Sequence, residues 1–395
     1  MTRALCPLFR SVHQRVVACM YLARMAAGLA SSPAPAIPGL RCLCYTADVL
    51  PIVWSWRLRP ENAKHHVLLL TGWDESFVKY GDVISELLEA GLNVYAMDWR
   101  SQGLSGRHLL DTQRTHVESF DDHLEDLSFF VNEVVAGSCK VRTSELTCLA
   151  HSMGGLISLM AAAGERGMFQ RLVVCSPMLR MKCGMPHVVA LLLGRIFCRL
   201  GLGASYAPGE GGVDATSRPI KSRRTSDKQR LSTYEEIRRT FPIIAMGGMT
   251  NRWVVEAIKA QDWFQSRAQQ VSIPVLLLEA EVDDFVCTSR PFSHLCRESA
   301  SCRRLFYPAV YHEVLFEKDW ARSHAIEATI AFLKSGEYPA SGEMTVVAPP
   351  PLSEEGERQQ QTNGLVVVRR LCLVAAATGV VVAAVVVRRG ARGTK

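Results

Sequence analysis

Short apolar runs alternate with longer segments of helical spacing through most of the chain. Six of these runs lack polar alternation and have the length of strands buried on both faces: residues 67–70, 92–97, 146–150, 172–175, 275–278 and 305–307. Between them, apolar residues recur at helical spacing, as at Val83 and Leu87 and again along 120–134. This alternation predicts an α/β fold with a mostly parallel sheet and helices on both faces. An alternating stretch at 47–59 predicts antiparallel edge strands in addition.

The alternation stops between residues 179 and 271, where the pattern predicts no buried strand. Because consecutive elements of a sheet are joined by short connections, this long segment is expected to lie outside the sheet, as a cap over the strand ends. It contains an apolar and basic stretch at 188–203 and a basic loop at 218–230. The core is therefore predicted in two parts, residues 42–178 and 272–336.

The C-terminal part of the chain has the pattern of a membrane anchor. Residues 337–364 are rich in Pro, Glu and Gln, which favours a disordered linker. Within 365–389, an uncharged run of seventeen residues lies between paired arginines, and as a helix it would be about 25 Å long. We expect a transmembrane tail anchor at 365–389, followed by a short basic tail at 390–395. Arginines on both sides of a short span are typical of tail anchors in intracellular membranes, mitochondrial or peroxisomal; a buried hydrophobic helix is the alternative.

The net charge of +7 is carried by the two ends of the chain. Residues 1–41 and 364–395 contain basic residues and no acidic residue, whereas residues 42–363 carry 34 basic and 38 acidic residues. The body therefore has no basic field for a phosphate backbone, which argues against nucleic-acid binding. The N-terminal extension, 1–41, has the composition of a targeting segment or a membrane-surface helix, with an untargeted extension as the alternative.

The thirteen cysteines are an odd number, and several lie in apolar runs, where a free thiol packs as a small hydrophobic group. Cys42 and Cys44 are too close for a zinc pair, and Cys296 and Cys302 have no histidine at ligand spacing. The sequence thus predicts a reducing compartment and no metal site.

Residues 149–155, LAHSMGG, follow a predicted strand and open a helix. A serine in the turn between a strand and a helix is the pattern of a nucleophile elbow, which points to Ser152 as the nucleophile. Ala150 and Gly154 are small enough for the helix to pass close to the strand, and His151 precedes the serine. Ala150 stands where this motif usually has glycine.

A serine nucleophile needs a histidine base and a carboxylate that orients the base, in the chain order serine, acid, histidine. Asp283 follows the predicted strand 275–278, and His312 follows 305–307, so both are expected at the strand ends where such sites form. Asp284 is an alternative acid from position alone. The alternative bases are expected to be surface or packing histidines: His65, His66, His116, His151 and His294.

The oxyanion of the tetrahedral intermediate needs two backbone donors. One is expected from the residue after the nucleophile, Met153, and the other from the loop after the first parallel strand, at Trp73. Gly72 provides backbone freedom for that turn. Trp73 is also expected to pack under the cap.

At these residues the chain resembles the α/β-hydrolase serine hydrolases that include lysophospholipase L2 and monoacylglycerol lipase. The resemblance runs from about residue 49 to about residue 334 and is carried by residues 71–106, 149–155, 175–181, 281–286 and 311–319. It implies an α/β-hydrolase fold with a helical cap and a triad of Ser152, Asp283 and His312. It also implies Trp73 and Met153 as oxyanion donors.

The expected function is hydrolysis of a single acyl ester of a lysophospholipid or monoacylglycerol through an acyl-enzyme, with no cofactor. The substrate would be a single-chain lipid ester whose chain is held by the apolar stretch 188–203. One alternative is an acyltransferase or a peptidase of the same fold, because fold alone does not set the acceptor. Another is a membrane adaptor without catalysis, which the presence of all three triad residue types opposes. The oligomeric state is open.

Overall fold

The computed structural model describes residues 40–41, 53–56, 65–164, 167–213, 223–240, 242–299, 301–338 and 343–347. All of them belong to one compact unit, residues 1–348. The predicted anchor at 365–389 and the basic tail at 390–395 lie outside the described residues. In the part of the chain that is described, no helix has the length and apolar character needed to cross a membrane.

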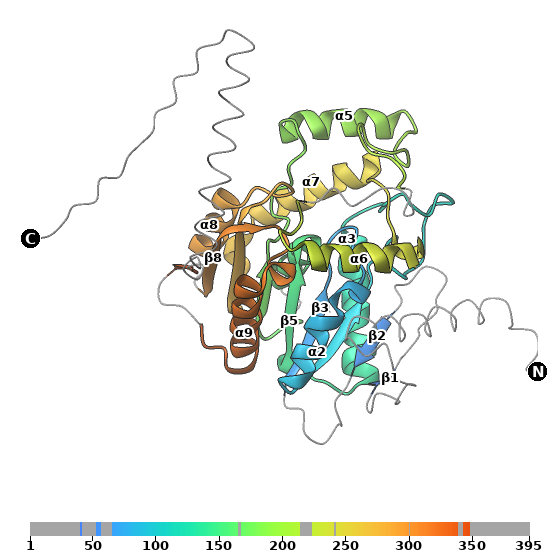
Figure 1. The fold of residues 1–395 in the computed structure, drawn as a ribbon. Coiled ribbons are helices and arrows are strands. Elements are labelled where there is room, and N and C mark those ends of the chain that lie inside the picture. Colours follow the sequence, from blue (N-terminus) through green and yellow to red (C-terminus); the bar gives the residue numbers. More distant parts are fainter. Residues whose placement is uncertain are drawn as a thin grey trace, which may run out of the picture. The chain divides into compact units, whose positions relative to one another are not determined.

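The described strands form a single sheet in the order β1-β2-β4-β3-β5-β6-β7-β8-β9 (Figure 1). Seven of them, from β4 to β9 in that order, pair in parallel, while β1 and β2 pair antiparallel at one edge. The bounds are β1 (Leu40–Arg41), β2 (Val53–Trp56), β3 (His65–Leu70), β4 (Leu92–Met97), β5 (Leu146–His151), β6 (Leu172–Cys175), β7 (Val275–Val282), β8 (Cys302–Tyr311) and β9 (Met344–Val346). The six predicted buried strands and an antiparallel edge strand are confirmed.

The helices lie between the strands in the chain. They are α2 (Gly81–Glu89), α3 (Asp121–Phe129), α4 (Ser152–Ala163), α5 (His187–Arg199), α6 (Lys228–Thr240), α7 (Asn251–Gln265), α8 (Ser289–Glu298) and α9 (Asp319–Ser335). Helix α3 continues directly into a π-helix, η2 (Phe130–Ser138). Short 3₁₀ turns are η1 (Phe77–Tyr80), η3 (Thr143–Glu145), η4 (Pro242–Ile244), η5 (Ala268–Gln270) and η6 (Val314–Phe316).

Alternate residues of each strand face opposite layers of the core, because side chains alternate along a strand. Leu68 and Leu70 of β3 belong to one buried cluster, together with side chains of α3, η2, α4, α7 and α8. Val67 and Leu69 belong to the other, together with side chains of α2, α6 and α9. Helices on both faces explain why the central strands read as continuous apolar runs, and they confirm the predicted fold class.

The predicted cap, residues 179–271, contributes no strand to the sheet within its described parts, but it is not all cap. Helix α7 buries Trp253, Ala257 and Phe264 in the same cluster as α4, and it contacts α4 directly. Helix α5 packs along α7, and both lie beyond the strand ends in Figure 1. One side of α7 thus covers the sheet while α5 rests on it, so the separation of cap and core falls within the predicted segment.

The predicted disordered linker, 337–364, is wrong at its start. Residues 344–346 form strand β9, which pairs in parallel with β8. The pairing includes hydrogen bonds from the Arg304 N–H to the Glu343 carbonyl and from the Val347 N–H to the Phe306 carbonyl. An edge strand such as β8 presents unpaired backbone groups, which a short passing segment can satisfy.

The expectation of free thiols is wrong for one pair of cysteines. Cys296, near the end of α8, and Cys302, at the start of β8, are joined by a disulfide. The turn between the two elements brings their Cα atoms to 4.8 Å, within the range that a disulfide spans. Cys148 and Cys175 are buried thiols, as their apolar runs predict, and Cys139 is a buried thiol as well.

Candidate active site

Ser152 lies in the turn between β5 and α4, with φ at +49°. An L-residue rarely adopts this left-handed backbone, so the conformation must be held by its surroundings. Helix α4 also packs closely against the chain directly after β3: a Cβ added at Gly154 would lie 2.6 Å from the Thr71 carbonyl oxygen. Ala150 is fully buried in β5 directly before the turn. The strand, strained serine and helix form the predicted elbow.

The structure brings Ser152, His312 and Asp283 together from three separate parts of the chain. The Nε2 atom of His312 lies 3.1 Å from the Ser152 Oγ, and its Nδ1 lies 2.5 Å from the Asp283 Oδ2. Asp283 follows β7 and His312 follows β8, so the parallel strands deliver both side chains to the same edge of the sheet as Ser152. All three side chains are buried or nearly so.

The carboxylate of Asp283 is held by its backbone surroundings as well as by His312. Its Oδ1 accepts hydrogen bonds from the N–H groups of Phe285 and Val286, at 2.8 and 2.9 Å. Burial alone would raise the pKa of Asp283, but the charge and hydrogen bond of His312 and these two N–H groups lower it below its ordinary value. These contacts favour the ionised form of Asp283 and fix the orientation of its carboxylate.

The alternative acid and bases have other partners. Asp284 is partly exposed and forms an ion pair with Arg223. Among the histidines, His116 lies 3.0 Å from the Thr250 hydroxyl, His66 3.1 Å from the Tyr95 hydroxyl, and His294 3.0 Å from the Gln265 carbonyl. His65 begins β3 at the opposite end of the strand from Thr71. His151 differs from the other alternative bases because it lies beside His312, with the centroids of the two rings 4.9 Å apart.

The loop after β3 passes directly beside Ser152. A Cβ added at Gly72 would lie 3.1 Å from the Cβ of Ser152, so a larger residue here would require its neighbours to shift by a few tenths of an ångström. Trp73 follows, and its indole N–H donates to the Thr115 hydroxyl at 3.0 Å. The indole also lies against Trp253 of α7, with ring centroids 6.3 Å apart, which matches the expected packing under the cap. Met153 is the second residue of α4 and is buried.

The sequence did not predict a role for Glu75, a buried carboxylate beside this loop. The Glu75 carboxylate accepts from the Gly72 N–H at 2.6 Å and the Tyr80 hydroxyl at 2.7 Å, contacts the Lys79 ammonium at 2.6 Å, and lies 3.0 Å from His151 Nδ1. Burial would raise the pKa of Glu75, but Lys79 and His151 hold it well below its ordinary value. Glu75 and Lys79 at i and i+4 were the available signal. Glu75 thus joins the loop of Gly72 to His151, the residue before Ser152.

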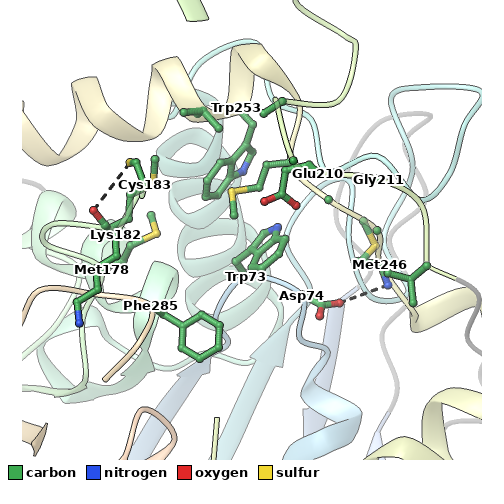
Figure 2. A pocket seen from close by; sticks show the side chains of 18 of the residues that line it. Trp73, Asp74, Met178, Lys182, Cys183, Glu210, Gly211, Met246, Trp253 and Phe285 are labelled. Carbon is green, nitrogen blue, oxygen red and sulfur yellow. Dashed lines mark hydrogen bonds between the residues drawn. The ribbon is translucent and has the colours of Figure 1, made fainter. Parts of the chain in front are cut away.

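A pocket of about 670 Å³ opens onto Ser152 and His312, within the size range of ligand pockets. Figure 2 shows Trp73, Trp253 and Phe285 around it. Its apolar wall includes residues of α5 and the neighbouring cap segments, namely Met181, Met185, Ala190, Leu193, Phe197, Met246 and Met249. Among the described residues, no group of three or more His, Cys, Asp or Glu side chains is arranged to hold a metal ion.

Comparison with known proteins identifies the family of this chain. The family model described as serine aminopeptidase, S33 (Hydrolase_4) matches residues 61–319. Lysophospholipase L2 of Escherichia coli is 32% identical over 298 residues, which cover 72% of this chain and 86% of the relative. Monoacylglycerol lipase of Mycolicibacterium smegmatis is 26% identical over 272 residues, covering 68% of this chain and 86% of that protein.

Solved structures share the fold at low sequence identity. A soluble variant of the Saccharomyces cerevisiae monoglyceride lipase superposes with a TM-score of 0.60 at 16% identity, covering 77% of this chain and 98% of that one. A carboxyl esterase of Bacillus coagulans superposes with a TM-score of 0.59 at 16% identity, covering 74% and 96%. The family match over more than half of the chain and the sheet topology lead to one conclusion: the chain belongs to the Hydrolase_4 family of serine hydrolases and has the α/β-hydrolase fold.

Proposed function

We propose that this protein is a serine esterase that hydrolyses the single acyl ester of a lysophospholipid or a monoacylglycerol. The observation that carries the proposal is the continuous contact of Ser152, His312 and Asp283, of which Ser152 and His312 line a pocket with an apolar wall from α5. The names of the relatives, lysophospholipase L2 and monoacylglycerol lipase, support the choice of a lipid ester.

In the first half of the reaction, the Ser152 oxygen attacks the ester carbonyl carbon while His312 Nε2 takes the hydroxyl proton. Asp283 holds the Nδ1 proton of His312 and stabilises the imidazolium that forms. The carbonyl oxygen becomes an oxyanion, and the backbone N–H groups of Trp73 and Met153 are proposed to bind it. The bond from carbonyl carbon to alcohol oxygen then breaks, and His312 gives its proton to the departing alcohol.

In the second half, water replaces the alcohol. His312 takes a proton from the water, whose oxygen attacks the acyl carbon and forms a second oxyanion at the same donors. This intermediate collapses by breaking the bond to Ser152, and the serine recovers its proton from His312. The products are a fatty acid and a glycerol or glycerophospho compound, and the protein returns to its starting state.

The apolar cap residues support a long acyl chain as the group next to the ester. Leu193 and Phe197 line the pocket from one side of α5, and Met185 lines it from the preceding loop. Burying a chain against such side chains yields about 0.8 kcal/mol for each CH₂ group. This favours single-chain lipids over small hydrophilic esters.

We also propose that residues 365–389 anchor the protein in an intracellular membrane, mitochondrial or peroxisomal. The support is the uncharged run between paired arginines in the sequence. Carbonate extraction of cell membranes tests this: the full chain should stay in the pellet, and a chain ending at residue 348 should be released. Extraction of both chains alike would refute the anchor, and organelle markers in the pellet would identify the membrane.

The function is tested with a fluorophosphonate probe and a panel of substrates. The intact protein should be labelled and should release fatty acid from monoacylglycerol and lysophospholipid, whereas Ser152→Ala should do neither. A matched control, Ser158→Ala, removes a buried hydroxyl from α4 that donates to the Gly155 carbonyl within the helix. Ser158→Ala should keep labelling. Absence of labelling in folded wild-type protein would refute the nucleophile.

The family description favours one other candidate, an aminopeptidase. Such an enzyme must bind a free α-amino group, and the acidic side chains Glu210, Glu235 and Asp284 do line the pocket. Aminoacyl nitroanilides belong in the same panel for this reason. Faster turnover of these amides than of the lipid esters would replace the esterase proposal with the peptidase.

A further inference from the structure

Asp74 is an acidic residue held entirely by the insertion between β6 and β7. It directly follows Trp73 in the loop after β3, is 5% exposed and has φ at +57°. Within the described residues, each hydrogen bond of Asp74 comes from the insertion, at a sequence separation of 150 residues or more. The loop proposed to bind the oxyanion is therefore tied to a distant part of the chain.

The contacts converge on both the carboxylate and the backbone of Asp74. Arg224 Nη2 lies 2.9 Å and Arg238 Nη1 3.1 Å from the same carboxylate oxygen, Oδ2. The Met246 N–H donates to Oδ1 at 3.3 Å, the contact drawn in Figure 2. The Tyr234 hydroxyl donates to the Asp74 carbonyl at 3.3 Å. Because Tyr234 and Arg238 are one helical turn apart, the same face of α6 supplies two of these partners.

Arg224 joins this cluster to the loop of the histidine. Its carbonyl accepts from the Glu313 N–H at 2.9 Å, and its Nη1 lies 3.6 Å from the Glu313 carboxylate. Its guanidinium also lies within 6.0 Å of the rings of Trp73 and Phe285. Glu313 follows His312, and Asp74 follows Trp73. Arg224 therefore contacts both the residue after the proposed base and the residue after the proposed oxyanion donor.

The charged groups in these contacts are buried, so each of them depends on its partners. Arg224 and Arg238 are 8% and 5% exposed, so removing one of the charges leaves the others in a medium that solvates them poorly. Burial raises the pKa of Asp74, while the two guanidinium groups act in the opposite direction. A left-handed φ at a residue other than glycine also costs free energy unless surrounding contacts hold it.

We infer that Asp74, Arg224 and Arg238 are positioning residues. Through them, the insertion between β6 and β7 holds the loop of Trp73 in the geometry that binds the oxyanion. The inference rests on the proposed function. Without the two arginines, Asp74 would leave its strained conformation. The adjacent backbone N–H of Trp73 would then no longer point at the oxyanion. A shift of about 1 Å at a group that stabilises the transition state costs up to roughly a hundredfold in rate.

The experiment measures kcat and KM of the full chain on p-nitrophenyl butyrate, a short uncharged ester with no headgroup for an arginine to bind. Arg238→Gln, Arg224→Gln and Asp74→Asn remove one charge each, and asparagine tolerates a positive φ as aspartate does. We expect kcat to fall roughly tenfold to a hundredfold with little change in KM, as for loss of an interaction made in the transition state. Arg238→Lys, which keeps the charge, should recover part of the loss.

Two further variants separate positioning from general support of the cap. Arg230→Gln breaks the ion pair between α6 and Asp319 at the start of α9 without touching Asp74, and should keep the wild-type kcat. The double variant Asp74→Asn with Arg238→Gln should be no slower than Asp74→Asn alone, because residues that act through one another are not additive. If Arg224→Gln does not fold, Arg238→Gln and the double variant decide the question.

Several results would overturn the inference. A wild-type kcat in Arg238→Gln and Asp74→Asn would do so, as would an equal loss in Arg230→Gln. An effect confined to KM for lysophospholipids would show that the arginines bind the phosphate of the substrate instead. If the wild-type protein hydrolyses no ester at all, the proposed function and this inference fall together, whereas active wild type with unaffected variants overturns the inference alone.

Discussion

Asp283 and Asp284 are adjacent in the chain, but only Asp283 faces His312. Its Oδ2 lies 2.5 Å from the His312 Nδ1, while Asp284 turns outward to an ion pair with Arg223. Two backbone N–H groups fix the Asp283 carboxylate from the other side. The two neighbouring carboxylates therefore have different surroundings: Asp283 is buried beside His312, and Asp284 is exposed in the lining of the pocket.

This difference predicts unequal effects of the same substitution. Asp283→Asn should lower kcat by about a thousandfold or more, because the amide favours the wrong tautomer of the base. Asp284→Asn is the matched control and should change kcat by no more than about twofold, as expected for an exposed ion pair. Both are measured on a short ester with the fluorophosphonate labelling rate as a second readout. Equal losses in the two variants would contradict the assignment.

Gly154 is predicted to be intolerant of a single added methyl group. A Cβ there would lie 2.6 Å from the Thr71 carbonyl oxygen and 2.9 Å from that of Leu70, backbone atoms at the end of the central strand β3 and directly after it. Gly154→Ala should lower the free energy of unfolding by about 1–3 kcal/mol and slow labelling of Ser152, since α4 must move away from β3.

The control is Gly106→Ala, because an added Cβ at Gly106 meets nothing within 4 Å. Its unfolding free energy in urea should stay within about 0.5 kcal/mol of wild type. A Gly154→Ala protein of wild-type stability would contradict the close approach of α4 to the strand.

His123 is predicted to make the fold sensitive to acid. It is 2% exposed, its ring lies edge-on to Trp99 and Phe120, and within the described residues neither ring nitrogen has a hydrogen-bond partner. Burial, with a smaller contribution from nearby cations, lowers the pKa of His123 to about 3. Between its ordinary pKa of 6.5 and about 3, the unfolded chain binds a proton that the folded protein does not. Stability is therefore lost as pH falls through this window.

The test is urea unfolding near pH 7.5 and near pH 5. His123 should account for about 2 kcal/mol of the loss between these conditions, and His123→Phe, which keeps an aromatic ring, should show a loss smaller by that amount. The same pH dependence in the variant and the wild type would refute the prediction.

The outer face of α5 is predicted to affect the turnover of lipid substrates in vesicles and not the turnover of dissolved esters. Val188, Leu192, Ile196 and Leu200 follow one another at helical spacing and are all exposed, from 40% to 78%. Neighbouring side chains of the same helix line the pocket, so a lipid surface touching this face lies beside the entrance.

Val188→Ser with Leu192→Ser should lower turnover of monoacylglycerol in phosphatidylglycerol-containing vesicles roughly tenfold, because less apolar surface enters the lipid. Turnover of p-nitrophenyl butyrate should be unchanged. A matched pair at exposed positions away from α5, Met344→Ser with Val346→Ser, should leave both activities unchanged. An equal loss on both substrates would show damage to the fold instead of loss of a lipid contact.

Patterns between neighbouring residues were sufficient for the central sheet. The strands 92–97 and 172–175 match β4 and β6 at both ends, since a strand buried on both faces must be continuously apolar. The motif around Ser152 was readable for a similar reason: its strained turn needs small residues at fixed offsets in the chain. The order serine, acid, histidine then narrowed the acid to two neighbouring residues.

The remaining features depend on residues far apart in the chain. Position in the sequence did not decide whether Asp283 or Asp284 faces the histidine, although the family resemblance favoured Asp283. Backbone N–H groups and a distant histidine decide which carboxylate is buried. Strand β9 forms because β8 has a free edge, and its own sequence looks like linker.

By itself, the sequence determined the class of fold and predicted Ser152 as the nucleophile, because both follow from local spacing and residue type. Only the tertiary structure revealed the contacts of Asp74 with Arg224 and Arg238 and those of Glu75 with His151. These contacts join positions separated by 76 to 164 residues, and no local preference encodes them. They arise because folding buries charged and polar groups in one place, where each can be tolerated only beside its partner.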